Sequence, residues 1–394
     1  MPSLSIIFGY RNRDRDRVER CLSSLSKQSY NDFDVIFVDY GSNKNFAEEV
    51  KQVVETFPFA KYYYSNTNGY PWNRSHALNT GVRFSNSEYI LFADIDLIYS
   101  PNSISALMEN ASKDHAVFSS MFFLNKSFKR WDKIFEQPLV SLNNSGNEPI
   151  GAIFLINKSL FESIGGFDEF YCFWGVEDRD LYDRLNQMNI KSIPIDNYKY
   201  PIFHQWHPKV TDRKRDFFPE KWWDEVNIYY SIEKNNIIRN HGNWGKLIKD
   251  KDRPVFDAQK ANSIIISKYG KSYDKAQIID SIVGAVKSLP HNQYLEIILQ
   301  KRESYSFLNH VIKLSNLLSR KISFPLGLDY IENVEREKYY NPLNDFFYVI
   351  WYLIKRIELI KDYVFFDDDN IKVIRLMKND EDSFADNISK LKIF

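Results

Sequence analysis

Short apolar runs alternate with segments of helical periodicity through the first half of the chain. The runs have the length of buried strands, and the segments between them place apolar residues three or four positions apart. Strands that alternate with helices are typical of a parallel α/β sheet. The predicted strands are Leu4–Phe8, Asp34–Val38, Lys61–Tyr64, Tyr89–Ala93 and Ile150–Ile156, and the main predicted helices are Phe46–Phe57, Ser75–Phe84, Lys158–Ile164 and Glu177–Met188.

Three of these predicted strands end in polar loops. The loops are Tyr10–Arg13, Asp39–Ser42 and Asp94–Asp96. In an open parallel sheet, ligands bind beyond the carboxyl ends of the strands. We therefore expect the three loops to lie along one edge of the sheet and to form the binding site.

The pattern changes after about residue 245, where Lys, Asp, Ile, Leu and Tyr occur at helical spacing with few strand signals. We predict an α/β catalytic domain over residues 1–245 and a mainly helical C-terminal domain of unknown role over residues 246–394. Within the second, the stretch Phe346–Lys361 is aromatic and basic. One hypothesis is that it docks on a membrane surface or another subunit; the simpler one is a helix packed into the domain's own core.

Composition excludes several classes of protein. The 394 residues are 44% hydrophobic and 26% charged, with 52 Lys plus Arg against 52 Asp plus Glu. This balance gives no reason to expect nucleic acid as a partner. Two cysteines, Cys21 and Cys172, cannot form a disulfide framework or a cysteine-based zinc site. The start is unlike a signal peptide and no apolar run is long enough to span a bilayer, so we expect a cytoplasmic protein, or one peripheral at the inner membrane face; composition suggests a bacterial source.

The segment Asp94-Ile95-Asp96 is the first candidate for chemistry. It follows a predicted buried strand, and two carboxylates one residue apart can both reach one divalent cation if the backbone turns there. Mg²⁺ and Mn²⁺ prefer oxygen ligands and share them with phosphate oxygens. The pattern alone is weak, since it also fits a solvated turn after a strand.

Two further segments carry acids and histidines. Glu177, Asp178 and Asp180 begin a predicted helix, where acids suit the helix dipole. One of them is alternatively a general base beside an acceptor hydroxyl, with Trp174 as a flat wall for a sugar ring. His204 and His207 lie three residues apart, and one is a candidate third metal ligand.

Arginines are concentrated after the first strand. Arg11 and Arg13 come first and are the best placed to meet a diphosphate. Arg15, Arg17 and Arg20 interleave with acids, so we interpret them as a salt-bridged surface.

Four segments in this order resemble the β-1,4-galactosyltransferases and the bacterial family 2 glycosyltransferases of the chondroitin-polymerase type. The resemblance covers roughly residues 1–245 and does not extend to the tail. It implies a GT-A fold, in which a Rossmann-like, mostly parallel sheet is flanked by helices. It also implies Mn²⁺ (or Mg²⁺), a UDP-sugar donor and inversion of configuration. The segments are Ile6–Arg13, Trp72–Gly81, Phe92–Ile98, and Gly165–Asp168 followed by Trp174–Asp180.

The resemblance also implies roles for individual residues. Asp94 and Asp96 would bind the metal and donor, Asp178 would be the base, and Glu177 would hold a sugar hydroxyl. His204 best matches the family's metal histidine, with His207 as the alternative. The expected donor contacts are Tyr10, Arg11, Arg13, Asp39, Trp72, Arg74, Ile95 and Trp174.

The chain departs from the family pattern in three places. Asp39 is followed by Tyr40 where many members have a second aspartate, which puts the usual uracil contact in doubt. Val176 and Arg179 replace a glycine and an aspartate of the galactosyltransferase pattern beside the sugar pocket. The donor sugar therefore cannot be assumed to be galactose.

The hypothesis is an inverting, metal-dependent transferase that moves a hexose or N-acetylhexosamine from a UDP-sugar to an oligosaccharide or lipid-linked glycan. Capsule or lipopolysaccharide synthesis would be the setting. One alternative is a non-catalytic glycan-binding or scaffold protein that retains the fold. Another is a sugar-nucleotide nucleotidyltransferase, which would need a glycine-rich phosphate loop, and Gly9 stands alone near the N-terminus.

Overall fold

The chain forms two compact units. One is Met1–Pro208 with Val226–Arg253, and the other is Lys209–Glu225 with Pro254–Phe394. The computed structural model describes residues 2–146, 151–172, 175–208, 222–242, 244–253, 261–266, 284–285, 288–290, 293–300, 360–367 and 371–378. Among these residues, every helix is too short or too polar to cross a membrane.

The first unit is built on a seven-stranded sheet with the order β3-β2-β1-β4-β8-β6-β9. The first four strands along the chain are parallel, and β8 runs antiparallel to its neighbours β4 and β6. The sheet is therefore mostly parallel, as the alternating sequence pattern predicts. The strands are β1 (Leu4–Tyr10), β2 (Phe33–Tyr40), β3 (Ala60–Ser65), β4 (Tyr89–Ala93), β6 (His115–Phe118), β8 (Ile153–Asn157) and β9 (Lys191–Pro194).

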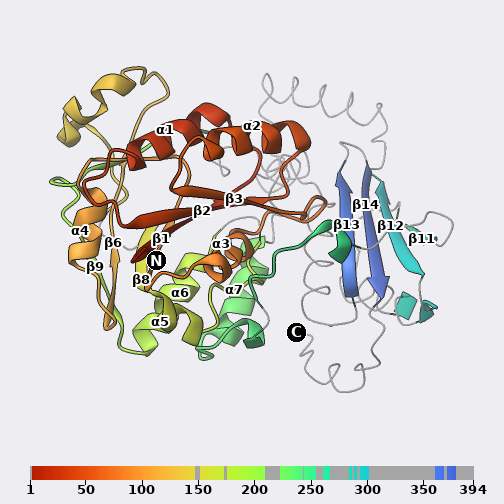
Figure 1. The fold of residues 1–394 in the computed structure, drawn as a ribbon. Helices are drawn as coiled ribbons and strands as arrows, with labels where there is room; N and C mark the ends of the chain where they lie inside the picture. Colours follow the sequence, from red (N-terminus) through yellow and green to blue (C-terminus); the bar gives the residue numbers. More distant parts are fainter. Residues whose placement is uncertain are drawn as a thin grey trace, which may run out of the picture. The chain divides into compact units, whose positions relative to one another are not determined.

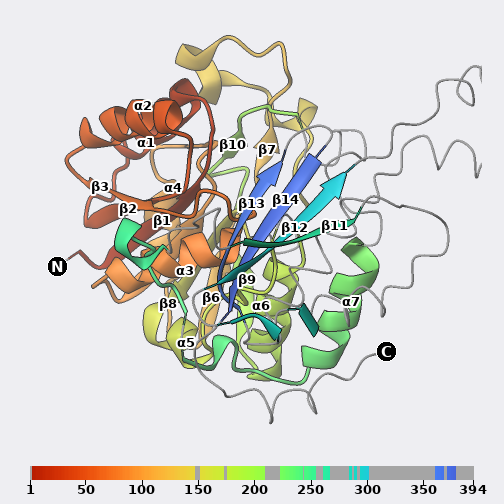
Figure 2. The same ribbon diagram turned by 90° about the vertical axis from the view of Figure 1, so that its right-hand side faces the viewer.

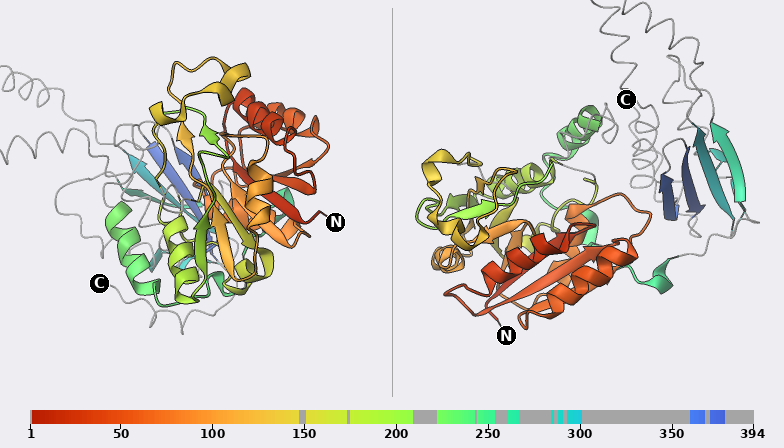
Figure 3. Two further views of the ribbon diagram at one scale, coloured as in Figure 1. Left: turned by 90° about the vertical axis from the view of Figure 1, so that its left-hand side faces the viewer. Right: turned by 90° about the horizontal axis from the view of Figure 1, so that it is seen from above.

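Helices cover both faces of this sheet, as Figure 1 and the left view of Figure 3 show. One core layer joins α1, α2 and α4 to the sheet, and the other joins α3, α5 and α6 to its opposite face. This three-layer arrangement agrees with the fold that the sequence resemblance implies. The helices are α1 (Arg15–Leu25), α2 (Lys44–Glu55), α3 (Arg74–Phe84), α4 (Ser103–Glu109), α5 (Lys158–Ser163), α6 (Glu177–Gln187) and α7 (Trp222–Glu233).

Period-two alternation assigns the side chains of β1 to the two layers. Leu4, Ile6 and Phe8 pack in the layer with α1 and α2, and Ile7 packs in the layer with α3. At Gly81 an added Cβ would lie 2.3 Å from the Ile7 side chain, so this glycine lets α3 lie close against the sheet. The close approach fixes the helix whose first residue is Arg74.

A second, three-stranded sheet has the order β5-β10-β7 (Figure 2). Its strands are β5 (Leu97–Tyr99), β7 (Phe122–Phe123) and β10 (Ile202–His204). In the antiparallel pairing of β5 and β10, His204 lies opposite Leu97. The register therefore brings His204 next to Asp96, which is 108 residues earlier in the chain.

The described part of the second unit is mainly strand, so the prediction of a mainly helical C-terminal domain is wrong for these residues. They form a four-stranded sheet in the order β11-β12-β14-β13, drawn in cyan and blue in Figure 1. Branched residues such as those of Ala261–Ile266 favour strands over helices. Of the Phe346–Lys361 stretch, only Ile360 and Lys361 lie in the described residues, where they begin β13. The strands are β11 (Ala261–Ile266), β12 (Tyr294–Gln300), β13 (Ile360–Asp367) and β14 (Ile371–Lys378).

Candidate active site

The polar loops meet at one edge of the sheet, as the sequence predicts. The strands β2, β1 and β4 are neighbours, and their parallel register aligns Tyr10 with Asp39 and Phe8 with Ala93. Asp94 follows directly, and its backbone N–H donates to the Ala152 carbonyl at 3.1 Å. The loops after these strands therefore share the carboxyl edge of the sheet with residues from β8.

Asp96 lies between two histidines. Nε2 of His204 is 3.5 Å from Asp96 Oδ1, and Nε2 of His207 is 3.1 Å from Asp96 Oδ2. The three residues each offer one ligand atom, and these atoms lie within 4.8 Å of one another. Both histidines considered from the sequence thus reach the same carboxylate.

The donor set fits a divalent transition metal. Asp96 Oδ1 is buried and makes no hydrogen bond within the described residues, so it retains a lone pair for a cation. A carboxylate with two imidazoles suits Mn²⁺ better than Mg²⁺, which prefers oxygen ligands. The two histidines hold the pKa of Asp96 down at about 2 against the opposing effect of burial, which keeps the ligand ionised.

Asp94 faces a different partner. The guanidinium of Arg74 donates to Asp94 Oδ1 from Nε at 3.2 Å and from Nη2 at 3.1 Å. Its Nη1 lies 3.1 Å from Asp178 Oδ1 and 4.0 Å from Glu177 Oε1. Three carboxylates therefore surround one arginine, and the Asp94 side chain belongs to this cluster rather than to the group around Asp96.

Burial shapes the protonation of this cluster. It raises the pKa of Glu177 to about 7, with the negative charge of Asp178 acting in the same direction. Burial also raises the pKa of Asp178, against the pull of Arg74. The three carboxylates hold the pKa of Arg74 above its usual value although burial opposes this. The site thus has a permanent cation beside an acid poised near neutral pH.

Two local features of the backbone position Glu177 and Asp178. At Gly151 an added Cβ would lie 1.7 Å from Asp178 Oδ1, so only glycine leaves room for that carboxylate. Val176, the residue before α6, has φ 77° and lies in the left-handed region that β-branched residues rarely adopt. The chain therefore has strained backbone directly before Glu177, where the galactosyltransferase pattern has a glycine.

Most of the predicted donor contacts line the same edge, and several already have protein partners. Arg11 donates from Nη1 to the Tyr70 carbonyl at 2.7 Å. Asp39 is fully buried and accepts from the Ser42 N–H and the Tyr62 hydroxyl. Tyr10 and Ile95 are buried, and the Tyr10 hydroxyl donates to the Arg13 carbonyl. Trp72 packs edge-on against the Tyr40 ring. Trp174 lies outside the described residues.

Arg13 and two arginines beyond it lie closer to the histidines than the sequence indicates. The hydrogen bond to Asp96 raises the pKa of His207, and the nearby positive charge of Arg13 opposes this only weakly. Arg17, interpreted from the sequence as surface, has a side chain only 14% exposed and donates to the Trp206 carbonyl at 3.5 Å. Arg20 donates to Gln205 at 2.7 Å and lies over the Trp131 ring. Arg17 pairs with Asp14 at 3.2 Å, as the interleaved charges predict, but both arginines also hold the loop that carries His207 and are therefore more than surface residues.

Comparison with known proteins agrees with this architecture. Residues 5–169 match the family described as Glycosyl transferase family 2, and residues 136–207 match the N-terminal domain of galactosyltransferase. The two matches together span both acidic segments and both histidines.

Individual relatives are distant. Chondroitin sulfate synthase 3 from Homo sapiens is 24% identical over 152 residues, which is 34% of this chain and 16% of the relative. The Mus musculus protein of the same name is 25% identical over 143 residues, with the same shares. The chain thus spans about a sixth of the length of these relatives.

Among solved structures, the mannosyltransferase PcManGT from Pyrobaculum calidifontis, in complex with GDP-Man and Mn²⁺, is 18% identical with a TM-score of 0.40. The likeness covers 53% of this chain and 58% of that one, and it is too slight to bear on function. The family matches carry the comparison: the first unit contains a domain similar to those of glycosyl transferase family 2, with the GT-A fold.

Proposed function

We propose that the protein is an inverting, metal-dependent transferase that moves a hexose or N-acetylhexosamine from a UDP-sugar to a hydroxyl of a glycan. The observation that carries the proposal is the position of Arg74, which contacts Asp94 at the end of β4 and Asp178 at the start of α6. One guanidinium therefore links the acidic motif expected at the donor to the acid expected at the acceptor.

Asp178 suits the role of general base. Its carboxylate is one-third exposed, while Glu177 beside it is almost fully buried. A raised pKa makes a carboxylate a better proton acceptor, and Arg74 keeps it ionised. In the transfer, Asp178 accepts the proton of the acceptor hydroxyl, the hydroxyl oxygen bonds to the anomeric carbon, and the bond from that carbon to the diphosphate breaks. Attack from the face opposite the diphosphate inverts the configuration.

Asp96, His204 and His207 would hold the metal, which would neutralise charge on the departing diphosphate. Arg13 lies on the same side and can add a fixed positive charge. Glu177, with its pKa near 7, can donate or accept a hydrogen bond with a sugar hydroxyl at neutral pH. Synthesis of a bacterial surface polysaccharide is the setting we propose, although the relatives named above are from human and mouse.

A panel of UDP-sugars assayed with Mn²⁺ tests this function. We expect one UDP-hexose or UDP-N-acetylhexosamine to support transfer, with slow hydrolysis when no acceptor is present. Asp96→Ala should abolish Mn²⁺-dependent UDP binding. Asp114→Ala is the matched control, because Asp114 is exposed just before β6 and outside the site.

Two results would contradict the proposal. Mn²⁺-independent UDP binding of normal strength in Asp96→Ala would remove the metal site. Binding of UDP-sugars without any turnover or hydrolysis would favour a non-catalytic glycan-binding protein that retains the fold.

A further inference from the structure

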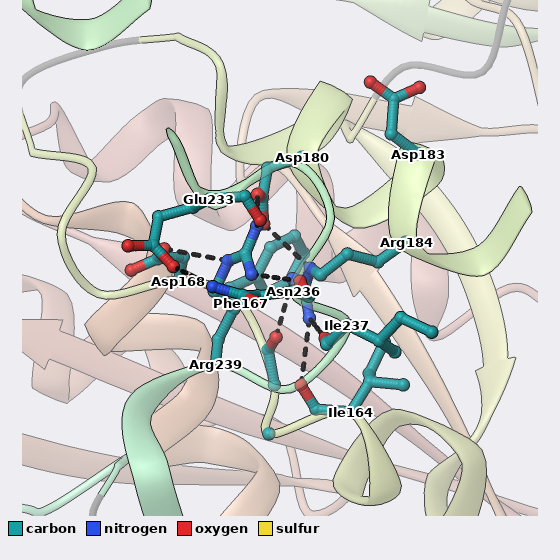
Figure 4. Close-up of polar contacts among 12 residues, drawn as sticks. Ile164, Phe167, Asp168, Asp180, Asp183, Arg184, Glu233, Asn236, Ile237 and Arg239 are labelled. Carbon is teal, nitrogen blue, oxygen red and sulfur yellow. Dashed lines mark hydrogen bonds and ion pairs between the residues drawn. The ribbon is translucent and has the colours of Figure 1, made fainter. Parts of the chain in front are cut away.

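A second cluster of charges lies buried behind the first turns of α6 (Figure 4). It consists of Asp168, Asp180, Arg184 and Arg239, whose side chains are only 1–4% exposed. Two negative and two positive charges balance one another. Arg239 lies beyond both family matches, which end at residues 169 and 207.

Asp180 is the centre of this cluster. Its Oδ2 accepts from Arg184 Nε at 2.8 Å, and its Oδ1 accepts from Arg239 Nη2 at 2.6 Å. Arg239 Nε lies 3.1 Å from Asp168 Oδ2. The Tyr229 hydroxyl of α7 donates to the same Asp168 oxygen at 2.7 Å. The carboxylate of α6 is thus held from two sides, by its own helix and by the segment after α7.

The two arginines also fix the loop that precedes Asp168. Arg184 donates to the carbonyls of Ile164 at 3.0 Å and Gly166 at 2.9 Å. The Arg239 backbone N–H donates to the same Ile164 carbonyl at 3.0 Å. A Cβ at Gly165 would lie 2.1 Å from the Arg239 carbonyl oxygen, so the two backbones touch. Loop, helix and the segment after α7 form one clamped unit.

This clamped unit is connected to the active site through the first turn of α6. Asp180 is two residues after Asp178, in the first turn of the same helix. A rotation or shift of that turn would change the 3.1 Å contact between Asp178 and Arg74. A misplacement of about 1 Å in an active site can reduce turnover about 100-fold.

We propose that Arg239 is a positioning residue for Asp178, because it clamps Asp180 and Asp168 and so fixes the first turn of α6 against Arg74. The inference rests on the proposed function, in which Asp178 is the general base. Arg239 touches none of the residues proposed to bind the metal, so its effect should be on turnover rather than on donor binding.

The first test compares two arginine-to-lysine variants. Lysine at position 239 keeps the charge but cannot bridge both aspartates with a planar fork. We expect Arg239→Lys to lower kcat about 10- to 100-fold while the KM for the donor and Mn²⁺-dependent UDP binding stay within about twofold. Arg83→Lys is the control: Arg83 holds the Trp244 carbonyl and ring but does not contact α6, so its kcat should be unchanged.

A milder variant covers the case in which Arg239→Lys does not fold. Tyr229→Phe deletes one hydrogen bond to Asp168 and no charge, and it should lower kcat in the same direction by a smaller factor. Wild-type kcat in every folded variant would overturn the proposal. So would an equal loss of kcat and UDP affinity, which would indicate general damage.

A double mutant separates this inference from the proposed function. If Arg239 acts through Asp178, Arg239→Lys should have no further effect on the residual activity of Asp178→Asn. Additive losses would overturn the positioning role and leave the base assignment intact. Full activity of Asp178→Asn alone would instead remove the base, and the positioning role with it.

Discussion

Two buried charge clusters lie on either side of the first turns of α6, and they differ in balance. At the active site, Asp94, Glu177 and Asp178 surround the single Arg74, and their side chains are 9–39% exposed. Behind the helix, Asp168 and Asp180 face Arg184 and Arg239, and no side chain exceeds 4%.

The difference in charge balance indicates different roles for the two clusters: the one around Arg74 suits chemistry, and the one around Asp180 suits structural support. The first cluster has an excess of negative charge and partial access to solvent, so it can accept a hydroxyl proton. The second has its charges matched, directs hydrogen bonds at backbone carbonyls and is almost fully buried, so a ligand cannot reach it. Substitutions should therefore affect chemistry in the first cluster and folding or positioning in the second.

The largest effect should come from Asp178, the proposed base. Asp178→Asn keeps the shape of the side chain and removes its ability to take a proton, so kcat should fall about 10²- to 10⁴-fold while UDP binding persists. Steady-state kinetics and UDP titration measure the two quantities. Asp183→Asn on the same helix is the control, since Asp183 points away from the buried cluster in Figure 4 and bonds Tyr230. A fully active Asp178→Asn would show that the unbalanced cluster is not the catalytic one.

Breaking the balanced cluster should instead destabilise the fold. Arg184→Met leaves Asp180 with one of its two arginines and removes the arginine donor from the Gly166 carbonyl, while the Ile164 carbonyl keeps the Arg239 N–H. Removal of one partner from a buried pair costs about 3–5 kcal/mol in the free energy of unfolding. Urea unfolding followed by circular dichroism measures it. A loss below about 1 kcal/mol would mean that the cluster behaves like a surface ion pair.

Glu177 gives the active-site cluster a pH dependence of stability that extends to neutral pH. Its pKa is about 7 in the folded protein against an ordinary value of 4.5. Between these values the unfolded chain releases the proton and the folded protein keeps it, so stability falls as pH rises through this window. The total loss in the free energy of unfolding across this window is about 3 kcal/mol.

Glu177→Gln should remove this decrease of stability with rising pH. The variant should match wild type near pH 4 and exceed it in stability by up to about 3 kcal/mol at pH 8. Thermal unfolding across this range measures the difference. An unchanged slope would assign the pH dependence to another group.

The sequence predicts the edge of the site better than its interior. The predicted strands that end at Phe8, Val38 and Ala93 are enough to place the loops after them together, because parallel neighbours end on one side of a sheet. The sequence does not show that Asp94 and Asp96 face different partners. That separation depends on Arg74 reaching across from α3 and on the β5–β10 register.

Contacts between distant segments explain the other misses. Arg17 pairs with Asp14 as the interleaved charges predict, but the sequence does not show that it also reaches the Trp206 carbonyl. Nor does the sequence show that Arg239, in the segment after α7, reaches Asp180 of α6. The strands of the C-terminal region were missed for a different reason. Short apolar runs with interspersed charges fit both the helical period and the strand period. The Asp-rich residues 367–370 between two such runs were the available turn signal for the β13–β14 hairpin.

The smallest effect should come from crowding the base without removing it. Gly151→Ala puts a methyl group where Asp178 Oδ1 now lies, so the carboxylate must move away from Arg74. We expect kcat to fall about 10- to 100-fold with little change in UDP binding. Gly146→Ala is the control, because among the described residues its added Cβ meets nothing within 4 Å and its φ of 80° costs only about 1–2 kcal/mol of stability. Equal kcat values for the two variants would mean that turnover tolerates displacement of Asp178. In that case the active-site cluster would not depend on exact geometry, and the buried cluster behind α6 would not be needed to position it.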